Sequence, residues 1–231
     1  MGQGWQAAAK ELGGDAARYM HHVKGLSMEP DDVRGHKAKL LGMVTATRGA
    51  DHLRSRYTIE EFYLPAEHTA KILGRPVPPD PDSYEGKAWA TFWTENLCAA
   101  ADALGICKFV TKWLSPGLLG FAEMAESVGA STGMAITPGQ LSEIGERIYN
   151  LERLFLVRLG LRRGDDRVPD RLREPWKHGP RRGTMVDEDK FQRMLDEYYE
   201  IHGWDRDGVP RRETLARLGL DQLVALPAGV A

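Results

Sequence analysis

The stretch from Asn96 to Phe109, NLCAAADALGICKF, combines an acid, a glycine and a cysteine that core packing alone would not select together. Asp102 is expected in the last turn of a helix, where the partial negative charge of the carbonyl end disfavours a carboxylate. Gly105 suits the position after the helix, because glycine enters the left-handed backbone conformation without steric cost. Cys107 follows this cap, so its sulfur can point into a cavity. Residues that break a local rule in this way indicate a specific contact.

Two long helices are expected to position this segment. The run 83–104 has many alanines, few glycines and apolar residues at helical spacing. A second, amphipathic helix begins at Pro138 behind the N-cap Thr137 and reaches about residue 159. We expect these helices to be the two longest elements and to pack against each other. Their apolar positions are Trp89, Phe92, Trp93, Leu97, Ala100 and Leu104 in the first, and Leu141, Ile144, Ile148, Leu151, Leu154, Phe155 and Val157 in the second.

Shorter helices are expected elsewhere, and no segment shows the alternation of apolar and polar residues that is typical of strands. Thr58 and Glu61 have the spacing of a capping box, which predicts a helix that begins after Thr58. Pro116 suits the first position of another helix. The pattern predicts an all-α, irregular multi-helix fold. The remaining expected helices span about 6–12, 36–47, 116–128, 187–201 and 214–218, with a stiff proline-rich connection at 76–81.

The composition narrows the class of protein. With 231 residues, 42% hydrophobic and 28% charged, the chain is expected to form a soluble globular protein with a sizeable core. A net charge of -2 argues against a nucleic-acid partner. No apolar run is long enough to span a membrane, and two cysteines are too few for a disulfide framework. These features predict a cytoplasmic protein.

The segment from Asp102 to Cys107, D-A-L-G-I-C, resembles the D-x-x-G-(L/I/V)-C motif of the tungsten-containing aldehyde ferredoxin oxidoreductases. Further stretches are similar to this family, so the resemblance covers nearly the whole chain. It implies that residues 1–231 form the family's C-terminal helical region, with a possible sub-boundary near 76–82, and that the N-terminal pterin-binding half is absent. The further stretches are 22–26, 46–54, 146–153, 164–169 and 196–220.

The resemblance assigns roles to the motif. Asp102 would accept hydrogen bonds from N–H groups of a tungstopterin, with tungsten or molybdenum as the metal, and Gly105 and Ile106 would also contact this cofactor. Cys107 would be the last ligand of a 4Fe-4S cluster. Cys98 lies nine residues away, on the opposite face of a regular helix, and is read as core packing. Both cofactors therefore need ligands from outside this chain. Without the resemblance, Asp102 could equally be an exposed or Lys108-paired carboxylate.

His52 matches the family histidine beside the tungsten, which is thought to hydrogen-bond or protonate the substrate oxygen. Histidine suits this role because its ordinary pKa of about 6.5 lets it exchange protons near neutrality. Arg48 and Arg54 could bind pterin phosphate or hold a loop, and each could equally be a solvated charge. The arginines of the segment 162–182 are expected on a solvated surface.

The function implied is the C-terminal part or a subunit of an oxidoreductase that oxidises an aldehyde to a carboxylic acid and passes electrons to ferredoxin. The missing N-terminal half or a partner subunit would complete it, and a homo-oligomer is possible. Two alternatives remain open. The chain could be a non-catalytic helical remnant that has lost the cofactor, or an interaction module in which the motif is coincidental.

Overall fold

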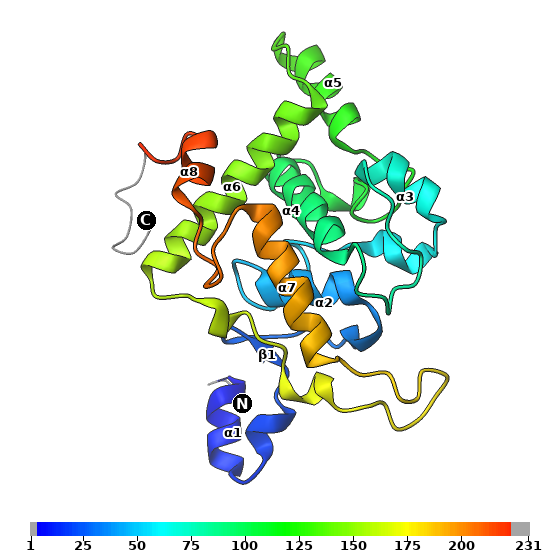
Figure 1. Ribbon diagram of the computed structural model, residues 1–231, viewed down its shortest axis with the longest axis vertical. Coiled ribbons are helices and arrows are strands. Elements are labelled where there is room, and N and C mark those ends of the chain that lie inside the picture. The colour runs from blue at the N-terminus through cyan, green and yellow to red at the C-terminus, as the bar shows by residue number, and fades with distance from the viewer. Residues whose placement is uncertain (1–3, 223–231) are drawn as a thin grey trace.

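The computed structural model of the protein describes residues 4–222. These form eight α-helices and one hairpin whose two strands have two residues each. The predicted all-α fold is confirmed (Figure 1). None of the helices in this range has the length and apolar character needed to cross a bilayer. The helices are α1 (Trp5–Leu12), α2 (Lys37–Thr45), α3 (Ala66–Leu73), α4 (Lys87–Ala103), α5 (Phe121–Thr132), α6 (Pro138–Arg158), α7 (Glu188–His202) and α8 (Arg212–Arg217), and the strands are β1 (His22–Val23) and β2 (Leu26–Ser27).

Helices α4 and α6 are the two longest, and they pack against each other as predicted. Helix α6 begins as expected, because Thr137 Oγ1 accepts a hydrogen bond from the Gln140 amide at 3.2 Å and Gln140 Oε1 accepts from the Thr137 amide at 2.9 Å. At the crossing, Gly145 lets the two backbones approach closely. A Cβ atom at Gly145 would lie 2.2 Å from the carbonyl oxygen of Asn96.

Helix α4 lies in the centre of the molecule, in contact with α2, α6 and α7 (Figure 1). Apolar residues are buried on both sides of it, as expected for a helix without a solvent face. One core lies around α2 and α7, and the other lies between α4, α5 and α3. The predicted sub-boundary near 76–82 is not tested by this packing and stays a prediction.

A buried polar network joins α4 to α7 and α6. Glu95 accepts a hydrogen bond from the hydroxyl of Tyr198, with 2.8 Å between this oxygen and Glu95 Oε2. His202 Nε2 lies 3.0 Å from the same carboxylate oxygen. Trp204 stacks on His202, and its indole N–H donates to Asn150 Oδ1 at 2.7 Å. Because buried polar groups are costly unless they are paired, this network fixes how the three helices meet.

The predicted capping box at Thr58 is wrong. Residues Thr58–Phe62 form a 3₁₀ turn, and the Thr58 hydroxyl is buried without a hydrogen-bond partner among the described residues. Nearby Glu60 is directed inward instead, where its carboxylate accepts hydrogen bonds from the amides of Ala38 and Lys39 at the start of α2. Capping of α2 by a distant carboxylate therefore overrides the local pattern.

The helix predicted at 116–128 begins later, at Phe121. Leu119 forms a parallel bridge with Thr111, and its carbonyl accepts from the Lys112 amide at 2.7 Å. This pairing holds the chain extended where a helix was expected. The helix then starts behind Gly120, whose amide donates to the carboxylate of Glu123 at 2.6 Å.

Candidate functional site

The predicted motif segment leaves the carbonyl end of α4 through a defined cap. Gly105 has φ +69°, as its predicted role requires. The Ile106 amide donates to the Ala101 carbonyl at 2.9 Å, and the Gly105 amide donates to the Asp102 carbonyl at 3.1 Å. These two bonds are the pair that defines a Schellman motif. The amides of Gly105 and Ile106 are therefore used by the helix end, and the Ile106 side chain packs against the core between α4 and α5.

Asp102 forms ion pairs with two cations at this helix end. Its carboxylate lies 3.0 Å from Arg54 Nη1 and also pairs with Lys108 Nζ. Both contacts offset the unfavourable position of a carboxylate beside the helix carbonyls. The Asp102 side chain is 40% exposed, so one side of the carboxylate still faces outward. The Lys108 pairing considered from the sequence is thus present, together with a second partner.

Arg54 ties the motif segment to helix α6. Its guanidinium is buried and pairs with Glu152 on α6 as well as with Asp102. Glu152 in turn accepts from Thr47 Oγ1 at 2.7 Å. Burial alone would lower the pKa of Arg54, but the nearby Glu152 carboxylate outweighs this effect and raises it. Of the roles considered for this arginine, these contacts are those of a residue that holds a loop.

The two cysteines have different environments, as predicted. Cys107 is exposed, whereas Cys98 is buried in the core between α4 and α5. Burial raises the pKa of the Cys98 thiol to about 12, so it stays protonated and cannot serve as a thiolate ligand near neutrality. Residues 4–222 contain no group of three or more His, Cys, Asp or Glu side chains arranged to hold a metal ion. Any metal at Cys107 would need its other ligands from elsewhere.

Two aromatic rings bring His52 to the motif segment. The imidazole stacks on Trp113 with 6.2 Å between ring centroids, and Trp113 meets Phe109 edge-on at 5.3 Å. The Trp113 indole N–H also donates to the His52 carbonyl at 3.4 Å. His52 is therefore connected through a short aromatic path to Phe109, which lies two residues after Cys107.

At the edge of the His52 ring, Nδ1 meets an acid that was not predicted from the sequence. His52 Nδ1 lies 3.0 Å from Glu29 Oε2, and Glu29 Oε1 lies 2.9 Å from Lys39 Nζ. Glu29 stands in the loop that follows the hairpin, and Lys39 is a buried residue of α2. No spacing in the sequence could reveal this contact, because it joins separate elements. Arg48, the other arginine considered for this site, is exposed and pairs with Asp51.

Apolar side chains that lie near Cys107 in the sequence are exposed. Phe109 is 60% exposed, and Leu104 and Val110 are exposed to a lesser degree. Exposed apolar groups that gather in one place usually mark a contact with another molecule. The charged groups Asp102 and Lys108 lie among them.

A buried ion cluster joins residues from four of the stretches that resemble the family. Asp166 Oδ1 lies 2.6 Å from Lys24 Nζ, and its Oδ2 lies 2.8 Å from Arg153 Nη1 and accepts from the Tyr199 hydroxyl at 2.6 Å. Burial lowers the pKa of Lys24. Burial would raise the pKa of Asp166, but Lys24 and Arg153 outweigh it and lower that pKa. The four stretches that supply these residues therefore contact one another through this cluster, which contains none of the predicted site residues.

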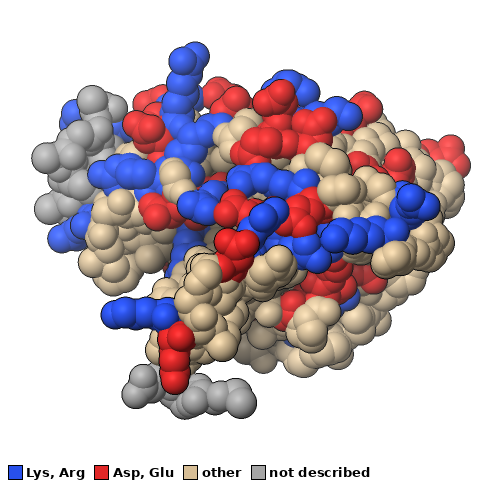
Figure 2. All heavy atoms as spheres, turned by 90° about the horizontal axis from the view of Figure 1, so that it is seen from below, with Lys and Arg blue, Asp and Glu red and all other residues tan. Residues whose placement is uncertain are grey.

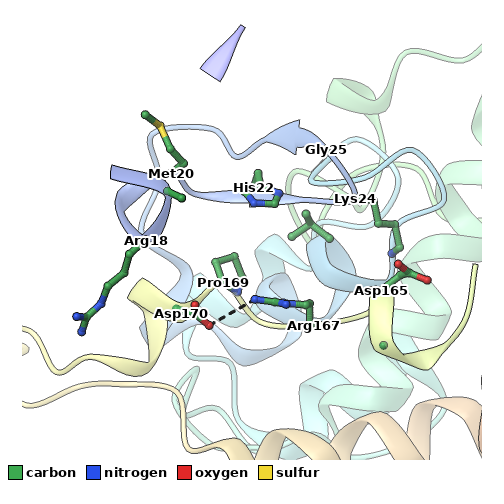
Figure 3. A pocket seen from close by; sticks show the side chains of 12 residues that line it. Arg18, Met20, His22, Lys24, Gly25, Asp165, Arg167, Pro169 and Asp170 are labelled. Atoms are coloured by element: carbon green, nitrogen blue, oxygen red, sulfur yellow. Dashed lines mark ion pairs between the residues drawn. The ribbon is translucent and has the colours of Figure 1, made fainter. Parts of the chain in front are cut away.

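A hollow of about 510 Å³ lies beside this cluster, between the hairpin and the loop after α6 (Figure 3). His22 and Arg167 line it from opposite sides, and Arg167 faces Asp170 at 3.6 Å. None of the site residues predicted from the sequence lines it. The hollow is lined by side chains of both charges and is distinct from the candidate site.

Charged side chains of both signs are interspersed on the face seen in Figure 2. The arginines of the segment 162–182, predicted as solvated surface, include several with ionic partners. Arg163 lies 2.6 Å from Asp196, and Arg173 lies 2.6 Å from Glu188. This segment is therefore fastened to α7 by ion pairs.

A family model described as "Aldehyde ferredoxin oxidoreductase, domains 2 & 3" matches residues 1–220. The tungsten-containing aldehyde ferredoxin oxidoreductase of Pyrococcus abyssi is 32% identical over 213 residues, which are 91% of this chain and 32% of that protein. The protein of the same description from Pyrococcus furiosus is 34% identical over 201 residues, 86% of this chain and 30% of its own length. The chain thus spans about a third of the length of these relatives.

Two further similarities extend the comparison. The "Aliphatic sulfonate oxidoreductase, WOR-like subunit" of Pyrococcus furiosus is 30% identical over 216 residues, 90% of this chain and 29% of that subunit. Among solved structures, the active site complex BamBC of benzoyl coenzyme A reductase matches with a TM-score of 0.71 over 95% of this chain and 36% of that chain. At 23% identity this structural match supports the fold alone.

Proposed function

Because the chain belongs to the aldehyde ferredoxin oxidoreductase family, in its domains 2 and 3, we propose that it is one part of a tungstopterin- and iron–sulfur-dependent oxidoreductase. The proposed reaction is the oxidation of an aldehyde and water to a carboxylic acid, with release of two protons and two electrons. The rest of the enzyme would come from polypeptide equivalent to the other two thirds of the relatives' length.

One observation carries this proposal. His52 lies far in the sequence from the segment that holds Asp102 and Cys107, and the fold links the two through Trp113, which contacts His52 and Phe109, and through Arg54, which pairs with Asp102. A proton-transfer group therefore lies close to the segment that carries a hydrogen-bond acceptor and an exposed thiol.

The side chains present fit one edge of the cofactor site. The outward side of the Asp102 carboxylate can accept hydrogen bonds from the N–H groups of a pterin, and charge-assisted bonds of this kind are strong. The exposed Cys107 can supply one thiolate of a 4Fe-4S cluster. Its other ligands, and the remaining contacts of the pterin, would lie on the missing part. Gly105 and Ile106 would contribute backbone shape, because their amides are occupied by the helix cap.

When bound, the metal–pterin group would accept the two electrons of the aldehyde, and the cluster would pass them on one at a time to a ferredoxin. The proposed task of this chain is to hold and to move protons. His52 would give or take a proton at the substrate oxygen, as imidazole can near neutrality. The apolar side chains around Cys107 would exclude water when the missing part covers them, which strengthens the hydrogen bond at Asp102.

The test is reconstitution with the polypeptide that supplies the missing two thirds. We expect the complex to hold tungsten or molybdenum together with iron and to oxidise aldehydes. His52→Ala should leave the metal content unchanged and slow turnover by about 10²–10⁴-fold. Cys107→Ala should lower the iron content. Cys98→Ala, the matched control, should change neither.

Failure of the complex to take up metal would overturn the enzymatic proposal and favour the non-catalytic helical module. One observation supports that second candidate. Asp102 already has two cationic partners, Arg54 and Lys108, so this helix end is stable without a cofactor. Normal turnover of the His52→Ala complex would instead remove only the role proposed for His52.

A further inference from the structure

His52 is held on two sides by groups from different elements. On one side its Nδ1 lies 3.0 Å from Glu29 Oε2. On another side its ring lies against Trp113, with an angle of 29° between the two ring planes. Within residues 4–222, the ionic contact of the imidazole is made by Nδ1 and none is made by Nε2. The half-buried ring thus has one nitrogen in a fixed contact and the other free to meet a ligand.

Glu29 is itself fixed by a buried cation. Lys39 Nζ lies 2.9 Å from Glu29 Oε1 and also pairs with Asp31. The Lys39 side chain is only 1% exposed, and it belongs to α2, a helix whose nine residues are all buried. These contacts fix the position of the Glu29 side chain beside the imidazole. One oxygen of Glu29 is thus placed to accept a hydrogen bond from His52 Nδ1–H.

We propose that Glu29 is a positioning residue that holds His52 with the proton on Nδ1 and the lone pair of Nε2 directed toward the substrate. This inference rests on the proposed function of His52 and adds the group that orients it. In a neutral imidazole, one nitrogen donates and the other accepts, and the partner of the first decides which is which. The carboxylate accepts only, so it selects the Nδ1–H tautomer. Nε2 is then the nitrogen that can take a proton.

The proposal is tested first on the isolated chain, by ¹⁵N nuclear magnetic resonance of the imidazole nitrogens. At a pH about two units above the ordinary imidazole pKa of about 6.5, the neutral ring dominates. His52 is expected to carry its proton on Nδ1. In Glu29→Ala the proton should distribute over both nitrogens. Glu29→Gln should weaken the preference in part, since an amide can either accept or donate.

The chain contains a natural control for this experiment. His68 Nδ1 stands 3.9 Å from Glu67 Oε1, and both side chains are largely exposed. At that separation no hydrogen bond forms. His68 should therefore show no preference for Nδ1, and Glu67→Ala should leave its signals unchanged. Circular dichroism of each variant verifies that the fold is kept.

In the reconstituted complex, Glu29→Ala should lower turnover by about 10-fold or more with unchanged metal content, as loss of a tautomer-holding carboxylate does elsewhere. An unchanged His52 tautomer in Glu29→Ala, with the fold intact, would overturn the positioning role. Normal turnover of His52→Ala would instead overturn the catalytic role of His52. The two failures are therefore distinguished by separate measurements.

Discussion

The carbonyl oxygen of Asn96 on α4 faces Gly145 on α6 so closely that a Cβ atom there would lie 2.2 Å away. This contact sits where the two longest helices cross. It sets the distance between them, because no side chain other than hydrogen fits in the gap. Helix α4 carries the candidate site at its end, so the crossing also sets where that site lies.

Gly145→Ala is expected to destabilise the protein by roughly 1–3 kcal/mol, the usual effect of inserting a methyl group into a closely packed contact. Gly139→Ala on the same helix is the matched control. Its Cβ would have only Thr137 Oγ1 within 4.0 Å, and alanine favours helices, so the variant should be slightly more stable. Urea unfolding of both variants measures the difference. Equal stability of the two would contradict the close crossing.

Lys24→Asn tests whether the buried ion cluster contributes more to stability than the turn conformation of Lys24 costs. Lys24 has φ +49° in the hairpin turn, a conformation that asparagine adopts more readily. The lysine ammonium, however, pairs with buried Asp166 at 2.6 Å. We expect a loss of about 3 kcal/mol, since removing one partner of a buried pair is strongly destabilising.

Lys177→Asn, at an exposed loop position, should change the stability by no more than about 0.5 kcal/mol. Both variants are compared by thermal unfolding. A stabilised Lys24→Asn protein would show that relief of the turn conformation outweighs the ion pair.

Glu60 should make the stability depend on pH. Burial raises the pKa of its carboxyl group to about 7, although Lys87 opposes this rise. Because the folded state then binds a proton that the unfolded state has released, stability falls as pH rises from about 4.5 to about 7, by an amount on the order of 3 kcal/mol. Below and above this window Glu60 adds no slope.

The variant Glu60→Gln lacks this titration. The difference in unfolding free energy between it and the unmodified protein therefore separates the contribution of Glu60 from those of the histidines. We expect that difference to change by a similar amount between pH 5 and pH 7, with the unmodified protein favoured at the lower pH. A constant difference over this range would mean that Glu60 is ionised throughout.

The cysteines should differ in their reaction with an aromatic disulfide reagent. One thiol, Cys107, is expected to react quickly in the folded protein, and Cys98 only after unfolding, because burial keeps it protonated and inaccessible. Cys107→Ala should therefore show no fast reaction, and Cys98→Ala should show the full one. Fast reaction of folded Cys107→Ala would refute the core assignment of Cys98.

Much of the fold could be predicted because its signals are local. The start of α6 depends on Thr137, Pro138 and Gln140, which are neighbours in the chain, and the end of α4 depends on Gly105. The errors at Thr58 and Pro116 have a common physical cause. In both places a contact outside the local pattern outweighs a preference of a few tenths to about 1 kcal/mol: Glu60 reaches the distant start of α2, and Leu119 pairs with Thr111, eight residues earlier.

The candidate site could be predicted only in part, because its supports are not local. Asp102, Cys107 and His52 were proposed from motif resemblance, whereas Arg54 was expected to bind pterin phosphate, to hold a loop or to be a solvated charge. Its link between α4 and α6 was not predicted. Glu29 was missed, since nothing near it in the sequence pairs it with His52. Residue type and spacing identify groups that can do chemistry, whereas their orientation depends on contacts that form only in the folded chain.

The cap at the end of α4 has a consequence for the thermodynamics of cofactor binding. Ile106 is fixed by its hydrogen bond to Ala101, and the Cys107 carbonyl accepts from the Val110 amide at 3.1 Å. The backbone on both sides of Cys107 is therefore ordered when the chain folds. Fixing one residue opposes association by roughly 1–2 kcal/mol of conformational entropy. Here that loss falls on folding, so under the proposed function a metal bound at Cys107 would meet a ligand whose main chain is already ordered.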